Sequence, residues 1–311
     1  KHIGWSDIIS SEGGLSFRYF EEGFLFDGAA NAIFEKEGYN EVDFMVILAY
    51  SNSVIPKHVR NLLNPTIHFK PGNFLNLPYI HCAHKEIWKV ADNNISISKQ
   101  DWDAHETSWD FKENELIRIF KSDAAITLEH ALDFYTAEWT GKFNELHDNE
   151  EELNRKFIEI YGLQDELTPD VPLNQVTILQ QKEIAIDGNN IKWNKDEIIK
   201  QLISYAMGCW MGRYRLDCPG LHIAHPNPTE EELAGYNAFG KPFEIDDDGI
   251  IPLMGEDSPF ADNAVNRMKE FVAQVFGEEN KAANIHFIEA TLGRNMTLEK
   301  FFKKDFWKDH L

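Results

Sequence analysis

The chain has 311 residues, and its 30 basic and 52 acidic side chains give a formal net charge of −22, so a uniformly acidic surface would repel a phosphate backbone. No apolar run reaches the roughly 18 to 20 residues that span a bilayer, which excludes membrane insertion. Three cysteines without a framework pattern, and no signal-peptide pattern, predict a cytoplasmic protein.

Residues 1–98 predict a mixed α/β unit. Aromatic runs at Leu15–Phe20 and Gly23–Phe26 are typical of strands, the second of them ended by a turn. Helical spacing continues over residues 42–49 and 54–63, until Asn64 and Pro65 stop it, and extended chain is expected at residues 67–69 and 75–78. Residues 1–100 carry 9 basic and 11 acidic groups, so a surface for an anionic partner is expected here.

Residues 99–170 predict an acidic helical spacer, with 6 basic and 19 acidic groups in residues 101–170. A capping box of Ser98 and Asp101 predicts a helix start, and Gly141 and the step at 148–149 predict breaks in the long helical segment beyond it. The acidic residues are expected to face solvent. One stripe at helical spacing contains Leu128, Leu132, Tyr135, Trp139, Phe143, Leu146, Glu150, Leu153, Phe157 and Ile160.

Residues 171–311 predict a mainly helical unit with one β-hairpin. The hairpin joins residues 184–186 to residues 191–193 through a turn that tolerates positive φ. Asn194 caps a buried helix over 198–211, and two further helices are expected from Ser258 to Gly277 and over 285–292. Together the three segments predict an α+β fold.

The residues provide no convincing catalytic or metal site. Asn64-Pro65 lacks the second proline and the aromatic residue of the loop with which amino-methyltransferases hold a flipped base, so a turn is expected. Cysteines and histidines at positions 209, 218, 222 and 225 do not have zinc-ligand spacing. The run Asp246–Asp248 is more typical of a solvated turn than of a cation site. We therefore expect a chain without catalytic, cofactor-binding or metal-binding residues of its own.

One positively charged cluster remains, around the stop at Asn64 and Pro65. Its cations and amides could meet phosphates and base edges, although an ordinary solvated helix end explains the same residues. The candidate DNA-binding residues are Arg18, Lys57, His58, Arg60, Lys70 and Asn73.

Long segments, in order and covering nearly the whole chain, resemble one family. These segments are Trp5–Phe34, Asn64–Pro78, Glu106–Phe111, Glu152–Pro169, Ile203–Tyr214 and Lys304–His310. They resemble the region just downstream of the methyltransferase core in large adenine-specific DNA methyltransferases of bacterial phage-exclusion (BREX) systems. The cofactor loop and the Asn-Pro-Pro-Tyr loop of such enzymes are not in this sequence, which begins at Lys1. The resemblance therefore implies an internal fragment of such a protein.

The resemblance implies a DNA-recognition and spacer fragment of the parent enzyme, in which residues 1–100 of this chain contact double-stranded DNA. S-adenosylmethionine is the implied cofactor of the parent, and none is expected in this fragment. The alternative is an interaction scaffold, in which the acidic segment 101–170 binds other defence-system proteins and makes no direct DNA contact.

Overall fold

The computed structural model describes residues 1–311 except 10–13, 37–40, 83–84, 123–126 and 311. The chain divides into two compact units, unit 1 with residues 1–99 and 142–177 and unit 2 with residues 100–141 and 178–311. Helices and small antiparallel sheets occur in the chain, which confirms the predicted α+β class. The division expected from sequence, at 1–98, 99–170 and 171–311, groups the residues differently and stays a prediction.

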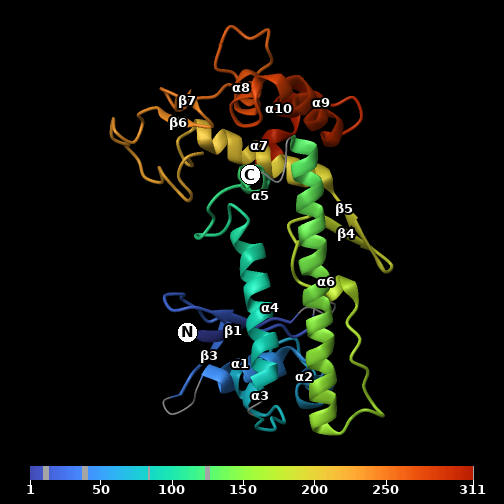
Figure 1. The fold of residues 1–311 in the computed structure, drawn as a ribbon. Helices are drawn as coiled ribbons and strands as arrows, with labels where there is room; N and C mark the ends of the chain where they lie inside the picture. The colour runs from blue at the N-terminus through green and yellow to red at the C-terminus, as the bar shows by residue number, and fades with distance from the viewer. Residues whose placement is uncertain (10–13, 37–40, 83–84, 123–126, 311) are drawn as a thin grey trace. The chain divides into compact units, whose positions relative to one another are not determined.

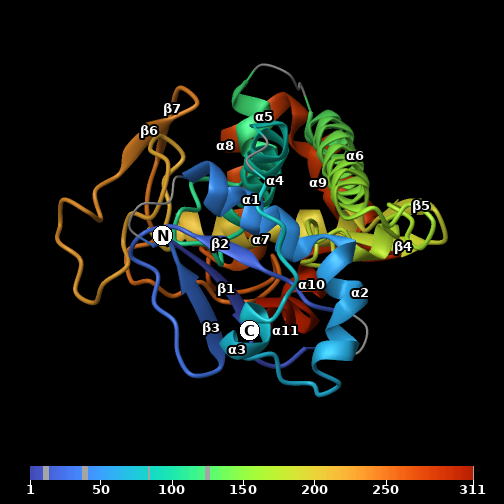
Figure 2. The same ribbon diagram turned by 90° about the horizontal axis from the view of Figure 1, so that it is seen from below.

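Unit 1 contains a three-stranded antiparallel sheet. Strand β1 (His2–Ser6) lies between β2 (Arg18–Phe20) and β3 (Ala30–Phe34), as Figure 2 shows. Alternate side chains of β1 point to opposite faces, and Ile3 and Trp5 point into the core. The Trp5 indole N–H donates to the Phe69 carbonyl at 2.7 Å, which satisfies its polar group inside that core.

Two helices of unit 1 form where the sequence predicts them. Helix α1 (Glu41–Asn52) buries most of its length, and α2 (Val54–Leu63) begins after Ser53, whose hydroxyl accepts the Ile55 N–H. The extended backbone of Asn64 ends α2, as predicted from the following proline. Large buried side chains of the unit 1 core are Trp5, Phe17, Phe44, Tyr50, Phe69 and Phe157.

Two local predictions in unit 1 are wrong. Residues 23–26 form a loop instead of a strand, because their side chains are exposed and the chain pairs with β1 only from Ala30. Part of the expected extended segment 75–78 belongs to a short helix, α3 (Pro71–Leu75), with its proline in the first turn.

Two long helices run through residues of both units, α4 (Lys85–Asp103) and α6 (Leu128–Tyr161, green in Figure 1). Ser98 lies inside α4 and does not start it, because Ile87, Ala91 and Ile97 continue one buried stripe across this position. The breaks predicted at Gly141 and at 148–149 are also wrong.

The stripe of α6 explains why the helix continues. Trp139, Phe143, Leu146 and Phe157 are all buried, so packing holds helical backbone on both sides of the expected breaks. Gly141 lies on the exposed side of α6, where it costs only about 1 kcal/mol relative to alanine. Tertiary contacts therefore override the local signal.

Unit 2 is largely helical and contains two hairpins. The predicted turn joins the first pair of strands, and α7 (Lys195–Trp210) is buried along most of its length, as expected. Helices α8 (Ala264–Phe276) and α9 (Lys281–Leu292) end at glycines 277 and 293, both with positive φ, as predicted. The elements of unit 2 are α5 (Glu115–Lys121), β4 (Ile184–Asp187), β5 (Asn190–Trp193), α7 (Lys195–Trp210), β6 (Tyr236–Ala238), β7 (Lys241–Phe243), α8 (Ala264–Phe276), η2 (Glu278–Asn280), α9 (Lys281–Leu292), α10 (Leu298–Lys304) and α11 (Phe306–His310), while η1 (Leu173–Gln175) belongs to unit 1.

The start predicted for α8 is wrong. The helix begins after Asn263, whose side-chain oxygen accepts the Asn266 N–H at 3.1 Å, and not at Ser258. Asn263 is fully buried and also donates to the Phe260 carbonyl at 2.8 Å, so a tight turn occupies the place of the expected first turn. Among the described helices, none combines the length and the apolar character needed to cross a membrane.

A buried ion pair in unit 2 joins the chain after α4 to the residue before β4. His105 contacts Glu183 through Nε2, and its Nδ1 lies 2.7 Å from the Asp101 carbonyl oxygen. Burial alone would lower the pKa of His105. The hydrogen bond to Glu183 and the negative charge of Glu183 outweigh burial, so the pKa of His105 is raised. Burial alone would raise the pKa of Glu183. The hydrogen bond to His105 and the positive charge of His105 outweigh burial, so the pKa of Glu183 is lowered. Both groups are therefore held in their charged forms.

Candidate nucleic-acid interface

Two of the candidate cations, Arg18 and Lys57, come together in unit 1. Arg18 is an exposed residue of β2, and Lys57 is a half-buried residue of α2. Each cation interacts electrostatically with Glu150 of α6, and the two cations repel each other. Three distant parts of the sequence thus supply one group of two positive charges and one negative charge.

The charges in this group are incompletely compensated. Partial burial lowers the pKa of Lys57, the attraction of Glu150 opposes that shift, and the charge of Arg18 adds to it. Partial burial likewise raises the pKa of Glu150, against the attraction of Lys57, Arg18 and His147. Within the part of the chain that the structure describes, neither Arg18 nor Lys57 makes a direct ion pair with a carboxylate. An anion placed beside the two cations would therefore gain electrostatic energy.

Sequence reasoning missed Glu150 as a member of this group, although a signal was present. Glu150 is the one charged residue in the apolar stripe predicted for residues 128–160. A carboxylate at that position must either reach solvent or find a cation. The sequence does not indicate which cations it finds, because Arg18 and Lys57 lie on separate elements.

Lys70 and Asn73 lie at the start of α3, where both take part in local structure. The Asn73 side-chain oxygen accepts the Lys70 backbone N–H at 2.8 Å. The Lys70 ammonium lies 2.9 Å from Asp7 Oδ2, and His68 Nδ1 lies at the same distance from that oxygen. Hydrogen bonds from Lys70 and His68 lower the pKa of Asp7, so the carboxylate stays charged and holds the Lys70 ammonium and the His68 ring.

The remaining candidates lie on α2. His58 is exposed and Arg60 is half-buried. Beyond them the Asn64 side chain holds the turn itself: its amide donates to the His68 carbonyl, and its oxygen accepts the Thr66 N–H at 3.1 Å. These bonds confirm that Asn64-Pro65 is a structural turn that ends a helix.

Among the described residues, the cysteines and histidines at positions 209, 218, 222 and 225 are not gathered within the mutual distance of metal ligands. Cys209 is buried in α7, whereas Cys218 is exposed. His222 Nε2 lies 3.0 Å from the Glu232 carbonyl oxygen and His225 Nε2 lies 2.9 Å from a Glu232 carboxylate oxygen, so each ring has a local partner.

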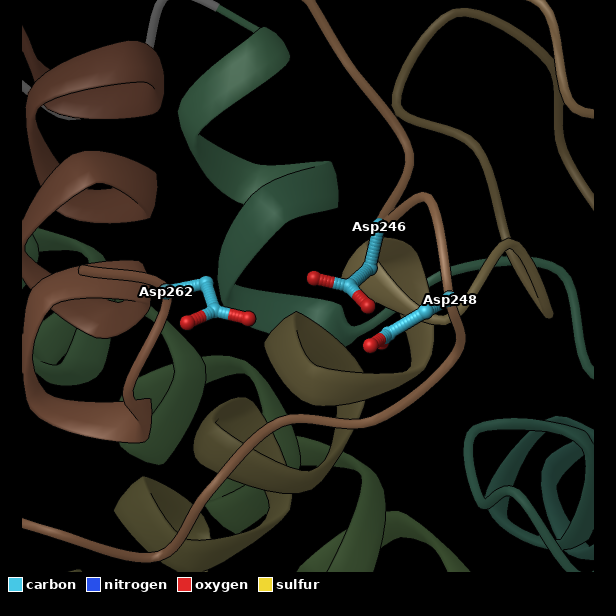
Figure 3. Close-up of side chains that lie close together, drawn as sticks. All are labelled: Asp246, Asp248 and Asp262. Atoms are coloured by element: carbon cyan, nitrogen blue, oxygen red, sulfur yellow. The ribbon is translucent and has the colours of Figure 1, made fainter. Parts of the chain in front are cut away.

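The sequence predicts a solvated turn at 246–248, and the structure leaves Asp247 and Asp248 exposed but buries Asp246. Asp246 and Asp248 face Asp262, with carboxylate oxygens within 4.8 Å of one another (Figure 3). Asp246 is buried and already forms an ion pair with Arg267 at 2.8 Å, and it also accepts the Ile250 N–H at 3.1 Å. The Arg267 guanidinium therefore compensates the charge of Asp246, the buried member of the group.

Two known proteins are similar to this chain over nearly its whole length. The chain is 35% identical over 323 residues to "Adenine-specific methyltransferase BrxX" of Escherichia coli O9:H4 (strain HS), covering 99% of this chain and 26% of that protein. It is also 35% identical over 318 residues to "Adenine-specific methyltransferase PglX" of Lacticaseibacillus casei (strain Zhang), covering 99% of this chain and 24% of that protein. The chain thus spans about a quarter of the length of these curated relatives. No family model matches the sequence. The resemblance to adenine-specific methyltransferases is confirmed for nearly the whole chain.

Proposed function

We propose that this chain is a non-catalytic, DNA-contacting segment of an adenine-specific DNA methyltransferase that acts in phage defence. The observation that carries the proposal is a match over 99% of this chain to about a quarter of two adenine-specific methyltransferases. In this proposal S-adenosylmethionine is bound, and the methyl group transferred, by regions of the enzyme other than this segment.

The segment's task in the proposal is to hold duplex DNA through its phosphates while the target adenine is presented elsewhere. Contacts to phosphates fix the position of a protein on DNA, and they need cations that are free to approach an anion. Arg18 and Lys57 meet this requirement, because they share one neighbourhood and neither is tied to a carboxylate among the described residues. Lys70 is a weaker candidate, since Asp7 already compensates its charge.

Glu150 has a defined part in this proposal. With no DNA present it offsets part of the repulsion between Arg18 and Lys57, and so keeps both near one position. A phosphate that arrives there competes with the carboxylate for the same cations. The site is therefore expected to bind DNA weakly by itself, with strong dependence on salt.

The experiment is a fluorescence-anisotropy titration of a labelled duplex of about 20 base pairs with this chain, over a series of salt concentrations. Lys57→Gln and Arg18→Gln should each weaken binding, and each should reduce the slope of log K against log [salt] by about 1. Lys89→Gln is the matched control, because Lys89 is an exposed lysine of the same unit on another helix.

Two results would contradict the proposal. Equal affinities and slopes for wild type and all three variants would remove Arg18 and Lys57 from any DNA contact. Absence of salt-dependent binding by the wild-type chain would remove DNA from the proposal altogether.

A second candidate function is a scaffold that binds other defence-system proteins. The observation in its favour is the excess of 19 acidic over 6 basic residues in positions 101–170, which suits a basic protein partner better than DNA. Capture of such proteins from a defence-system lysate by the immobilised chain, without capture of DNA, would favour the scaffold over the DNA-contacting segment.

A further inference from the structure

A cluster of aromatic rings covers part of the face of the unit 1 sheet that points away from the core. His2 pairs with Phe20 on one side and with Phe34 on the other, so all three side chains point to the same face. The His2 ring stacks on Phe20 at 4.9 Å between centroids, and its centroid lies 5.5 Å from that of Phe34. Burial beneath these rings lowers the pKa of His2, so the histidine acts as a neutral ring near pH 7.

The loop between β2 and β3 extends this surface. Phe24 packs on Phe20 at 5.7 Å, and Phe26 packs on Phe34 at 5.4 Å. Phe24 and Phe26 remain 50% exposed, Phe34 is 57% exposed, and Leu25 between the two loop phenylalanines is 96% exposed. Single exposed apolar residues are ordinary, but contiguous apolar patches on a folded protein mark interaction surfaces. We call His2, Phe20, Phe24, Leu25, Phe26 and Phe34 the aromatic cluster.

The border of the aromatic cluster along this loop is acidic. Glu21, Glu22 and Asp27 are all exposed, and the loop from 21 to 29 contains no basic residue. Asp27 is fixed in place, because its carboxylate accepts the Ala29 N–H at 2.8 Å. Glu21 lies 3.6 Å from the Lys99 ammonium, which leaves Glu22 and Asp27 as border carboxylates without a cation among the described residues.

This charge pattern selects among the possible occupants. A DNA backbone or an anionic lipid surface would be repelled by the acidic border, and a second copy of this chain would bring the same carboxylates face to face. An apolar protein surface bordered by lysine or arginine satisfies both the exposed rings and the carboxylates, with aromatic anchors at the centre and charge pairs at the rim. Arg18 lies on the same face of β2, but its interaction is with Glu150.

We propose that the aromatic cluster is a docking surface for a protein partner whose contact surface is apolar at its centre and basic at its border. The aromatic cluster includes neither Arg18 nor Lys57, so the variants that test one proposal leave the residues of the other unchanged, and either proposal can fail without the other.

The test uses two labelled amphipathic helical peptides of equal length, one of leucine and lysine and one of leucine and glutamate, as stand-ins for a basic and an acidic partner. Fluorescence anisotropy should show binding of the leucine–lysine peptide and at least about tenfold weaker binding of the leucine–glutamate peptide. Leu25→Ser combined with Phe24→Ser, and separately Glu22→Lys, should each weaken binding of the leucine–lysine peptide about tenfold.

The controls distinguish binding at the aromatic cluster from nonspecific electrostatic and hydrophobic binding elsewhere on the chain. Trp109→Ser removes an isolated apolar side chain that is 93% exposed, and Glu230→Lys makes the same charge reversal on an exposed residue of unit 2. Neither should change the affinity by more than about twofold, since both lie outside the aromatic cluster.

Three outcomes would overturn the proposal. The first is binding of the leucine–lysine peptide by the cluster variants as tightly as by wild type, and the second is equal binding of both peptides. The third is a concentration-dependent dimer in light scattering that the Leu25→Ser, Phe24→Ser variant abolishes, which would assign the surface to a second copy.

Discussion

The buried ion pair of His105 and Glu183 allows a quantitative prediction of stability. Replacing His105 with leucine leaves the fully buried carboxylate of Glu183 with one remaining side-chain donor, the Gln201 amide at 2.9 Å. The second carboxylate oxygen of Glu183 already has no partner among the described residues. Removal of one member of a buried pair costs about 3 to 5 kcal/mol, because the other charge is left uncompensated. His105→Leu should therefore lower the free energy of unfolding of unit 2 by about that amount.

The measurement is urea unfolding followed by circular dichroism, combined with amide hydrogen exchange in α7. His225→Leu is the matched control, because it removes an exposed histidine that is 2.9 Å from Glu232, and it should cost clearly less than His105→Leu because solvent screens an exposed pair. The double variant His105→Leu, Glu183→Leu should cost clearly less than the sum of the two single variants, since it leaves no buried charge unpaired. Equal losses for His105→Leu and His225→Leu, or strict additivity in the double variant, would refute the reasoning.

The pH dependence of the same pair has a defined sign. The raised pKa of His105 means that its contribution to stability is complete below the ordinary value of 6.5 and is lost as the pH rises through the folded-state pKa. The lowered pKa of Glu183 means that its contribution is present above the ordinary value of 4.5 and is lost as the pH falls through its folded-state pKa. The difference in unfolding free energy between wild type and His105→Leu should therefore be largest between pH 4.5 and 6.5 and should shrink on the alkaline side.

Three further predictions concern unit 1. Glu150→Gln should strengthen salt-dependent DNA binding several-fold in the anisotropy assay, because it removes the carboxylate that competes with phosphate, and unchanged or weaker binding would contradict that role. Phe157→Ala should cost about 3 to 5 kcal/mol in urea unfolding, since the ring is fully buried, and a loss below about 1 kcal/mol would show that its packing is not tight. Gly4→Ala should displace the Phe20 ring, which lies 2.9 Å from the position of the added Cβ, and loss of the cross-peaks between His2 and Phe20 in NMR spectra would report it, whereas unchanged cross-peaks would contradict the close approach.

Residue type alone does not predict how the charges of the candidate site are compensated. The six candidate residues are polar groups of the same mixed unit, most of them near a helix stop, and the structure gives them different surroundings. Lys70 is tied to Asp7, Asn73 supports the first turn of α3, and Arg18 and Lys57 share the neighbourhood of Glu150. Whether any of them contacts DNA stays a prediction. Charge compensation depends on partners that are distant in sequence, so composition near a turn could not distinguish these cases.

Features that depend on nearest neighbours along the chain could be predicted from sequence. The apolar period of α6, the turn between β4 and β5, the stop at Asn64, and the glycine ends of α8 and α9 follow from local backbone preferences and from which face must be buried. The resemblance to adenine-specific methyltransferases could also be recognised in the sequence, because it rests on long ordered strings of residues.

Features that depend on contacts between distant residues required the folded chain. Packing on both sides of Gly141 keeps α6 continuous, and pairing with β1 selects Ala30–Phe34 as a strand while leaving Gly23–Phe26 exposed. Long-range folding also places Glu150 beside two cations and gathers six side chains into the aromatic cluster. The local pattern does not identify a partner that lies far along the chain, so these arrangements emerge only when the elements pack.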